Sequence, residues 1–479
     1  MIVRSFEILA FSGYLFTAPL HAQQWESLGG AVFTLGFVGP VFGDSYSDKL
    51  LVGSGAKWLY ADGDSLETNG IGIWNGERWD TLPDRLQICF NNGCDAVYSL
   101  LRFHDQLYAD GAFPFYEPNG NLDSRFARLN NTSLEWEGYT CDAYFMNGIA
   151  SVAYETTADS LFLVGYYGSL CGLDSSSIYT YDGTNVQRFL PYDDWPNHDD
   201  YVGLVFKFLG SWYMTGLFDD LVTQQTYGFL RYTGSAWVPV PGFETAAPIK
   251  DILIHNDTLY MCGYFFEGPG IPGNMVAMYD GENWSNLGGG ITFDDMGTQL
   301  GIVTDLLWWR EKLYVSGQFY RAGGVPVEHI AAWNGQRWCG SGADLSPDNA
   351  VNSMTTWRDT LYIAGGFNSI DGVPMSRVAK WNGGDFDAVC SPSIGVEEHV
   401  LRSVPLSIQP NPTNDFLTLR CANHHQGFLS ITDACGRVVL HMSWHDEPID
   451  VRGLSNGVYQ LQLRDDEDLP LGSEMFLKY

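Results

Sequence analysis

Basic residues are scarce in this chain of 479 residues, which contains 25 Lys and Arg against 57 Asp and Glu. The formal charge of −32 would repel phosphate backbones and anionic membrane surfaces. Nucleic acid is therefore not an expected partner. Two interpretations of the charge stay open: an acidic surface that keeps the protein soluble, and a specific role in binding cations.

Long apolar runs and helical periodicity are also missing. The apolar stretch over 8–16 follows the one basic residue of the amino end and precedes small residues that end at Ala22. It is too short to span a bilayer as a helix, and this arrangement predicts a secretory signal peptide over residues 1–22. Because no later segment reaches the required length, we expect no transmembrane segment.

Recognisable catalytic signatures are absent as well. The chain has no H-E-x-x-H and no Gly-Lys of a phosphate loop. It has no paired C-x-x-C of a zinc site, so we predict neither catalytic residues nor a metal site. Its nine Cys are an odd number, so at least one is free or pairs between chains if the others are oxidised. The candidate pairs are Cys89 with Cys94, Cys421 with Cys435 and Cys339 with Cys390, and Cys262 is interpreted as buried and unbridged.

The sequence contains instead a unit of about 50 residues that recurs seven times, a period typical of propeller blades. Each unit has an apolar-aromatic run that ends in Gly, as in L-Y-x-x-G, and the seven glycines are Gly63, Gly111, Gly165, Gly216, Gly263, Gly317 and Gly365. A tight-turn dipeptide such as Asn334-Gly335 follows each run in phase and predicts a hairpin, while another strand precedes the run. Four short strands per period predict an all-β fold, with a seven-bladed β-propeller over residues 23–392.

The first segment after the predicted signal, 25–30, is similar to 284–289, the outermost strand of an internal unit. We expect it to pair with the last unit beside Trp381 and so to join the two ends of the array. Trp residues that recur in register are interpreted as packing between units rather than as sugar-stacking platforms.

The blade pattern ends after Cys390, so we interpret 393–403 as a linker and 404–479 as a separate domain. Six strand-like runs in this last segment predict a small Ig-like β-sandwich.

Four motifs of the last segment carry a family resemblance. They are SIQPNPTNDFLTL, ITDACGRVVL, LSNGVYQLQL and the terminal MFLKY. Their order resembles the type A C-terminal sorting domain of the type IX secretion system. The resemblance implies export to the cell surface or secretion, with the secretion machinery as partner. Its motif positions here are Pro410, Asn411, Pro412, Asp415, Asp433, Gly436, Gly457, Tyr459 and Lys478. The repeats resemble, more loosely, kelch-type propellers.

Propellers bind ligands on one loop face, and the corresponding loops are rich in carboxylates. The candidate binding residues are Asp193, Asp194, Asp199, Asp200, Asp219, Asp220, Asp294 and Asp295. Calcium or a basic partner would relieve the repulsion between them, and no other cofactor is expected. The sequence predicts a secreted or cell-surface binding protein with a protein or glycan ligand. The alternative is an extracellular glycan-active hydrolase, lyase or oxidase, which is less favoured because the repeats account for most unusual residues.

Overall fold

Every element in the described part of the computed structural model is a β-strand, which confirms the all-β class. The structure describes residues 24–33, 38–61, 63–68, 70–82, 89–90, 93–94, 96–116, 122–138, 152–157, 160–164, 173, 176–189, 201–220, 222–243, 247–268, 271–293, 301–341, 347–370, 372–387, 389–391, 406–421, 427–433, 438–464 and 470–479. The chain divides into two compact units, Met1–Ser393 and Ile394–Tyr479.

The first unit contains seven antiparallel sheets of four or five strands within the described ranges. The first sheet is β3 (Val38–Asp44), β4 (Lys49–Ser54), β7 (Ile71–Trp74) and β8 (Trp79–Asp80). The second is β11 (Val97–Phe103), β12 (Gln106–Tyr116), β13 (Leu122–Leu129) and β14 (Trp136–Gly138). The third is β15 (Val152–Thr157), β16 (Ser160–Val164), β17 (Ile178–Tyr181) and β18 (Val186–Arg188). The fourth is β19 (Tyr201–Phe208), β20 (Ser211–Asp220), β21 (Gln225–Tyr232) and β22 (Trp237–Pro239).

The remaining three sheets follow the same order of strands. The fifth is β23 (Ile249–His255), β24 (Thr258–Gly263), β25 (Val276–Tyr279) and β26 (Trp284–Asn286). The sixth is β28 (Ile302–Trp309), β29 (Lys312–Gln318), β32 (Ile330–Trp333), β33 (Trp338–Gly340) and β39 (Val389–Cys390). The seventh is β34 (Val351–Trp357), β35 (Thr360–Gly365), β38 (Val378–Trp381) and β1 (Trp25–Ser27).

Four smaller sheets accompany these seven in the described part of the unit. They are β2 (Val32–Phe33) with β5 (Trp58–Ala61) and β6 (Asp64–Glu67); β9 (Cys89–Phe90) with β10 (Gly93–Cys94); β27 (Ile291–Thr292) with β30 (Arg321–Ala322) and β31 (Val325–Pro326); and β36 (Ser369–Ile370) with β37 (Val373–Pro374).

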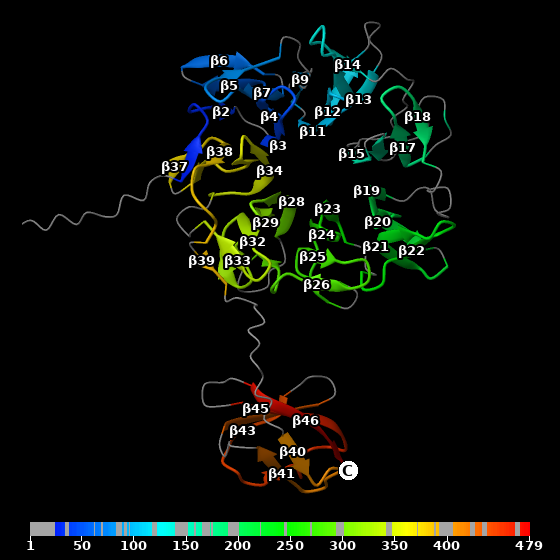
Figure 1. The fold of residues 1–479 in the computed structure, drawn as a ribbon, viewed down its shortest axis with the longest axis vertical. Helices are drawn as coiled ribbons and strands as arrows, with labels where there is room; N and C mark the ends of the chain where they lie inside the picture. Colours follow the sequence, from blue (N-terminus) through cyan, green and yellow to red (C-terminus); the bar gives the residue numbers. More distant parts are fainter. Residues whose placement is uncertain are drawn as a thin grey trace, which may run out of the picture. The chain divides into compact units, whose positions relative to one another are not determined.

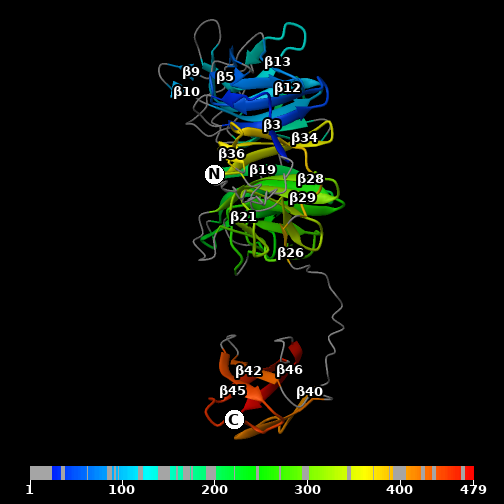
Figure 2. The ribbon, with the colours of Figure 1, turned by 90° about the vertical axis from the view of Figure 1, so that its left-hand side faces the viewer.

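The first strands of successive sheets contact one another. These contacts run from β3 to β11, β15, β19, β23, β28 and β34, and β34 in turn contacts β3. Figure 1 shows the sheets gathered around a common centre, and Figure 2 shows the same unit from the side. The last large sheet therefore lies against the first.

Aromatic pairs flank the hairpins between third and fourth strands and link neighbouring sheets. Trp333 is the cross-strand partner of Trp338 across the Asn334-Gly335 turn. The indole of Trp338 donates a hydrogen bond to the carbonyl oxygen of Leu287, which follows the outermost strand of the preceding sheet. The predicted packing role of the recurring Trp residues is confirmed at this position, as it is for Trp79, whose indole donates to Leu28 over 2.7 Å.

The first repeat differs from its prediction. We assigned the second strand of this unit to the run that ends at Gly63, but the structure gives this role to β4, which pairs with β3 and β7. The run at Trp58–Ala61 pairs with β2 and β6 in a side sheet instead. The assignment was wrong because two apolar runs that end near a glycine lie close together here, and only the partner strand distinguishes them.

The amino-terminal strand completes the seventh sheet, as predicted. Trp25 pairs with Trp381 and Ser27 with Ala379. An ion pair of 2.7 Å between Arg358 and Asp48 connects the first and seventh sheets. Residues separated by more than 300 positions are thereby joined.

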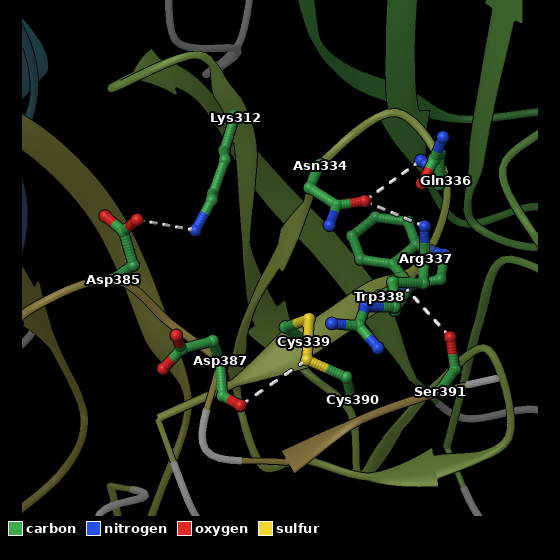
Figure 3. Close-up of a disulfide and its surroundings, with 10 residues drawn as sticks. All are labelled: Lys312, Asn334, Gln336, Arg337, Trp338, Cys339, Asp385, Asp387, Cys390 and Ser391. Carbon is green, nitrogen blue, oxygen red and sulfur yellow. Dashed lines mark hydrogen bonds and ion pairs between the residues drawn. A yellow bond between two sulfur atoms is a disulfide. The ribbon is translucent and has the colours of Figure 1, made fainter. Parts of the chain in front are cut away.

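A disulfide closes the carboxyl-terminal end of the unit. Cys339 in β33 is bonded to Cys390 in β39, as the sequence predicted, and the two are cross-strand partners (Figure 3). The hydroxyl of Ser391 accepts a hydrogen bond of 3.1 Å from the backbone N–H of Trp338. The last described residues of this unit are thereby attached to its sixth sheet.

Among the remaining cysteines, one prediction is confirmed and two predicted disulfides stay predictions. Cys262 is buried and free, which confirms its interpretation. Cys89 and Cys94 are cross-strand partners of the small β9–β10 sheet. The predicted partner of Cys421, Cys435, lies outside the described residues.

The second unit contains two antiparallel sheets around one hydrophobic core. One sheet is β40 (Leu406–Gln409), β41 (Phe416–Cys421) and β44 (Ile449–Asp450), and the other is β43 (Val438–Trp444), β42 (Gly427–Asp433), β45 (Gly457–Arg464) and β46 (Pro470–Lys478). Leu419, Ile431 and Leu461 lie in the shared core, and each is at most 1% exposed.

Candidate functional site

A β-bulge recurs at the same place in the first strands of the large sheets. The pairing register shifts between Val97 and Ser99, and between Ile249 and Asp251, Val303 and Asp305, and Val351 and Ser353. One extra residue is inserted at each shift: Tyr98, Lys250, Thr304 and Asn352. Bulges redirect side chains and are common beside functional sites.

These four extra residues line one cavity, which we call the bulge cavity. Its volume is about 270 Å³, and its lining comes from the first, second, fifth, sixth and seventh sheets. The lining residues are Gly39, Pro40, Tyr98, Ser99, Asp110, Lys250, Asp251, Thr304, Asp305, Asn352 and Ser353. Five sheets thus contribute to a single cavity.

The glycine of the repeat explains how the bulge is accommodated. A Cβ atom on Gly317 would lie 2.9 Å from the Cα of Val303 and closer still to the carbonyl oxygen of Ile302. The same clash with backbone at the start of the first strand occurs for Gly216, Gly263 and Gly365. The second strand therefore needs glycine where the bulged strand approaches it.

Two aspartates occupy the position after the bulge in the fifth and sixth sheets. The carboxylate of Asp251 accepts a hydrogen bond of 2.9 Å from the backbone N–H of Leu306 in the next sheet. Asp305 likewise accepts one from Met354 in the seventh sheet. Each side chain therefore fastens its own sheet to the following one.

The carboxyl groups of Asp251 and Asp305 also interact electrostatically with each other. Both residues border the cavity and are half-buried. Burial raises the pKa of Asp251 to about 6. Burial and the neighbouring charge of Asp251 raise the pKa of Asp305 well above its ordinary value. The pair therefore retains a proton under mildly acidic conditions.

Polar groups of the seventh sheet make equivalent bonds to the first. The hydroxyl of Ser353 accepts a bond of 3.3 Å from the N–H of Val41, and the side-chain amide of Asn352 donates one of 2.9 Å to the carbonyl of Val38. These residues have a structural role in addition to lining the cavity.

Tyr98 and Lys250 differ from the other lining residues because they are exposed. Tyr98 is 45% exposed. Within the described part of the chain, the ammonium group of Lys250 makes no hydrogen bond and no ion pair. Both residues are exposed to solvent and border the cavity.

Most of the aspartates that were predicted to form an acidic binding face lie outside the described residues. Asp193, Asp194, Asp199, Asp200, Asp294 and Asp295 are not among the described residues.

The remaining predicted pair, Asp219 and Asp220, forms the end of β20, beside the turn to β21. Asp220 accepts hydrogen bonds of 2.8 and 3.2 Å from the N–H groups of Val222 and Thr223, which lower the pKa of its carboxyl. Asp219 accepts a hydrogen bond of 2.6 Å from the hydroxyl of Thr226. These two carboxylates stabilise the turn.

No group of three or more His, Cys, Asp or Glu is placed to hold a metal ion among the residues that the structure describes. Calcium binding by the loops stays a prediction.

Two of the sorting-motif residues, Asn411 and Tyr459, contact the last strand of the second unit, β46. The side chain of Asn411 donates to the carbonyl of Met475 over 2.8 Å and accepts from the N–H of Leu477 over 3.0 Å. Pro410 and Pro412 flank it. The ring of Tyr459 stacks on Phe476, with 5.5 Å between centroids, and its hydroxyl donates to the carbonyl of Ser455 over 2.8 Å.

The other motif positions have simpler surroundings. Lys478 is 7% exposed and donates to the carbonyl of Tyr479. Asp433 and Gly457 lie at strand ends, the carbonyl of Asp415 accepts a bond of 2.9 Å from Val451, and Gly436 is outside the described residues.

Sequence reasoning missed the bulge cavity, although a signal was present. Tyr98, Lys250, Thr304 and Asn352 each stand thirteen residues before the glycine of their repeat. An apolar β-branched residue precedes each of them. The side chain at this position therefore differs between repeats, while the preceding residue type and the distance to the glycine stay constant.

Comparison with known proteins identifies the tail. Residues 407–470 match the family model described as the secretion system C-terminal sorting domain. The protein is therefore exported to the cell surface or secreted, and the type IX secretion machinery is the implied partner of the tail. The described ranges contain no helix that is long and apolar enough to cross a membrane. No curated protein matches the sequence.

Several solved structures are similar over most of the chain, at low identity. PorZ, an essential surface component of the type IX secretion system of Porphyromonas gingivalis, is 11% identical with a TM-score of 0.36, over 90% of this chain and 68% of PorZ. The extracellular domain of BT4673 from B. thetaiotaomicron is 10% identical with a TM-score of 0.43, over 95% of this chain and 59% of that domain. A fungal AA5-family alcohol oxidase in complex with copper is 10% identical with a TM-score of 0.38, over 95% of this chain and 98% of the oxidase.

Proposed function

We propose that this protein is an extracellular seven-bladed β-propeller of kelch-like repeats that binds a protein or glycan ligand in its bulge cavity. Export is provided by its sorting tail. The observation that carries the proposal is the convergence of Tyr98, Lys250, Thr304 and Asn352, inserted at the same register of four sheets, on one cavity.

Two observations support the propeller architecture. The first strands of the seven large sheets contact one another in sequence, and the seventh contacts the first. The amino-terminal strand β1 completes the seventh sheet, which removes an exposed edge at the junction. A propeller of this kind exposes a cavity near its centre to ligands while its sheets remain fixed.

Binding is favoured over catalysis because the polar lining residues mostly hold the sheets together. Asp251, Asp305, Ser353 and Asn352 all bond to the backbone of the following sheet. Groups engaged in this way are less free to transfer protons to a substrate. Tyr98 and Lys250, which remain exposed, suit recognition.

The proposal is tested with the full chain on arrays of glycans and extracellular proteins. The parent, the double variant Tyr98→Ala with Lys250→Ala, and the control variant Tyr60→Ala are compared. Tyr60 is 48% exposed and lies in the side strand β5, outside the cavity lining. We expect a ligand that binds the parent and Tyr60→Ala, with binding lost in the double variant. Equal binding by all three would reject the cavity as the site.

An extracellular glycan-active enzyme is the second candidate, and the presence of Asp251 and Asp305 together in the cavity lining favours it. Paired carboxyl groups with raised pKa values perform acid–base chemistry on glycans in many enzymes. The same glycans should be incubated with the parent and with Asp305→Asn. Product formation by the parent alone would establish catalysis and replace the binding proposal.

A further inference from the structure

We propose that the bulge cavity binds a single neutral sugar unit at the end of a glycan. This inference rests on the proposed binding function and specifies its ligand. Three features of the cavity carry it: its size, the mixture of charges in its lining, and an exposed aromatic ring beside hydrogen-bonding groups.

The size restricts the ligand. A volume of about 270 Å³ lies just below the range of about 300–1,000 Å³ that is usual for drug-sized ligands. One sugar ring with a few waters fits this space, whereas a folded peptide segment does not. The remainder of a glycan would extend from the cavity into solvent.

The charges of the lining disfavour an ionic ligand. Burial raises the pKa values of Asp251 and Asp305, which both line the cavity, so this pair resists carrying two full negative charges. The ammonium group of Lys250, on the residue next to Asp251, opposes a cationic ligand. An acidic sugar would meet the carboxyl groups of Asp110, Asp251 and Asp305 in the same small space. A neutral molecule avoids both conflicts.

The remaining groups match a polyhydroxylated ring. Lys250 donates hydrogen bonds, carboxylate and amide oxygens accept them, and the hydroxyls of Ser99 and Ser353 do both. Sugar hydroxyls also donate and accept at closely spaced positions. The exposed ring of Tyr98 offers an apolar face to the C–H groups of the sugar, as aromatic side chains at binding sites commonly do.

The experiment measures binding of defined sugars to the purified full chain by calorimetry and ligand-observed NMR. The neutral probes are glucose, galactose, mannose and N-acetylglucosamine, each free and at the end of a short oligosaccharide. Glucuronate and glucosamine are the anionic and cationic comparisons. The variants are Tyr98→Ala and Lys250→Ala, with Tyr60→Ala as the matched aromatic control and Lys49→Ala, at the start of β4, as the matched lysine control.

We expect at least one neutral probe to bind, with Kd raised at least tenfold by Tyr98→Ala and by Lys250→Ala and unchanged by either control. Tighter binding of glucuronate or glucosamine would overturn the neutral-sugar assignment but retain the cavity as a site. A neutral sugar that binds all variants equally would place glycan recognition elsewhere. If no sugar binds while an identified extracellular protein does so through Tyr98 and Lys250, the sugar inference fails and the proposed binding function survives.

Discussion

The repeat glycine provides the sharpest test of the relation between the bulge and the scaffold. In Gly317→Ala the new Cβ would lie 2.9 Å from the Cα of Val303 and 3.0 Å from the carbonyl carbon of Ile302. Both atoms belong to the backbone of β28, so the clash is not relieved by a side-chain rotation. The two strands have to separate, which also disturbs the hydrogen bond from Met354 to Asp305 in the adjoining sheet.

The expected cost combines two effects. Overpacking of a tightly packed interior costs about 1–3 kcal/mol, and a weakened hydrogen bond adds about 0.5–1.5 kcal/mol. We therefore expect Gly317→Ala to lower the free energy of unfolding by about 2–4 kcal/mol.

Urea unfolding followed by tryptophan fluorescence measures this change. Gly384→Ala is the matched control, because a Cβ there would meet no atom within 4 Å and its φ is not positive. We expect it to shift the free energy by less than about 0.5 kcal/mol. If Gly317→Ala unfolds at the same urea concentration as the parent, the close approach of the bulged strand does not require glycine and the reasoning is refuted.

Four further predictions follow from the sites described above. The pKa of Asp251 is raised from 3.8 to about 6 in the folded state, so this group stabilises the fold below about pH 4, and the stabilisation is lost as the pH rises through about 6. The melting temperature of Asp251→Asn should therefore vary less with pH than that of the parent. An unchanged dependence of the melting temperature on pH would contradict the raised pKa. Replacing Cys339 and Cys390 by Ser opens a loop with a sequence separation of 51 residues, so the unfolding free energy should fall by up to about 4 kcal/mol, whereas the parent under reducing conditions should match the variant. Deleting residues 400–479 should retain the protein in the periplasm by cell fractionation, and normal surface delivery would contradict this. Calcium should raise the melting temperature of the parent more than that of a variant with Asn at Asp193, Asp194, Asp199 and Asp200, and no shift in the parent would reject the ion-dependent version of the acidic loops.

Much of the fold was predictable because local chemistry repeats in phase. The Asn334-Gly335 turn predicted a hairpin, and the resemblance of 25–30 to 284–289 predicted that Trp25 completes the seventh sheet. In both cases the deciding signal lies in a few adjacent residues. Because 25–30 matches the outermost strand of an internal repeat, its partner must be the repeat that lacks an outermost strand.

The first repeat could not be placed in the same way. Lys49–Ser54 and Trp58–Ala61 are both short apolar runs near a glycine, and either run suits a strand. The choice depends on which run pairs with β7, and this pairing is a tertiary contact. Local pattern favoured the run with the aromatic residues, which in the structure belongs to the side sheet.

The bulge cavity was missed for a different reason. A bulge adds a residue that breaks the strict alternation of a strand, so a search for alternating patterns treats Lys250 and Thr304 as irregularities. That these residues line a common cavity becomes visible only when the strands are placed side by side in the structure. The three-dimensional arrangement then brings residues from five sheets to one cavity.

In the bulged strands, the residues that the scaffold requires differ from those proposed to contact a ligand. Glycine in the second strand and the hydrogen-bonding residue after the bulge are fixed by backbone contacts between strands and sheets. The inserted residue is under weaker constraint, since Tyr98 and Lys250 are exposed and each sheet tolerates a different side chain there. Substitutions at these two positions should therefore change ligand preference with little effect on stability. The geometry of the bulge holds the position, and under the proposed function the side chain there determines which ligand is bound.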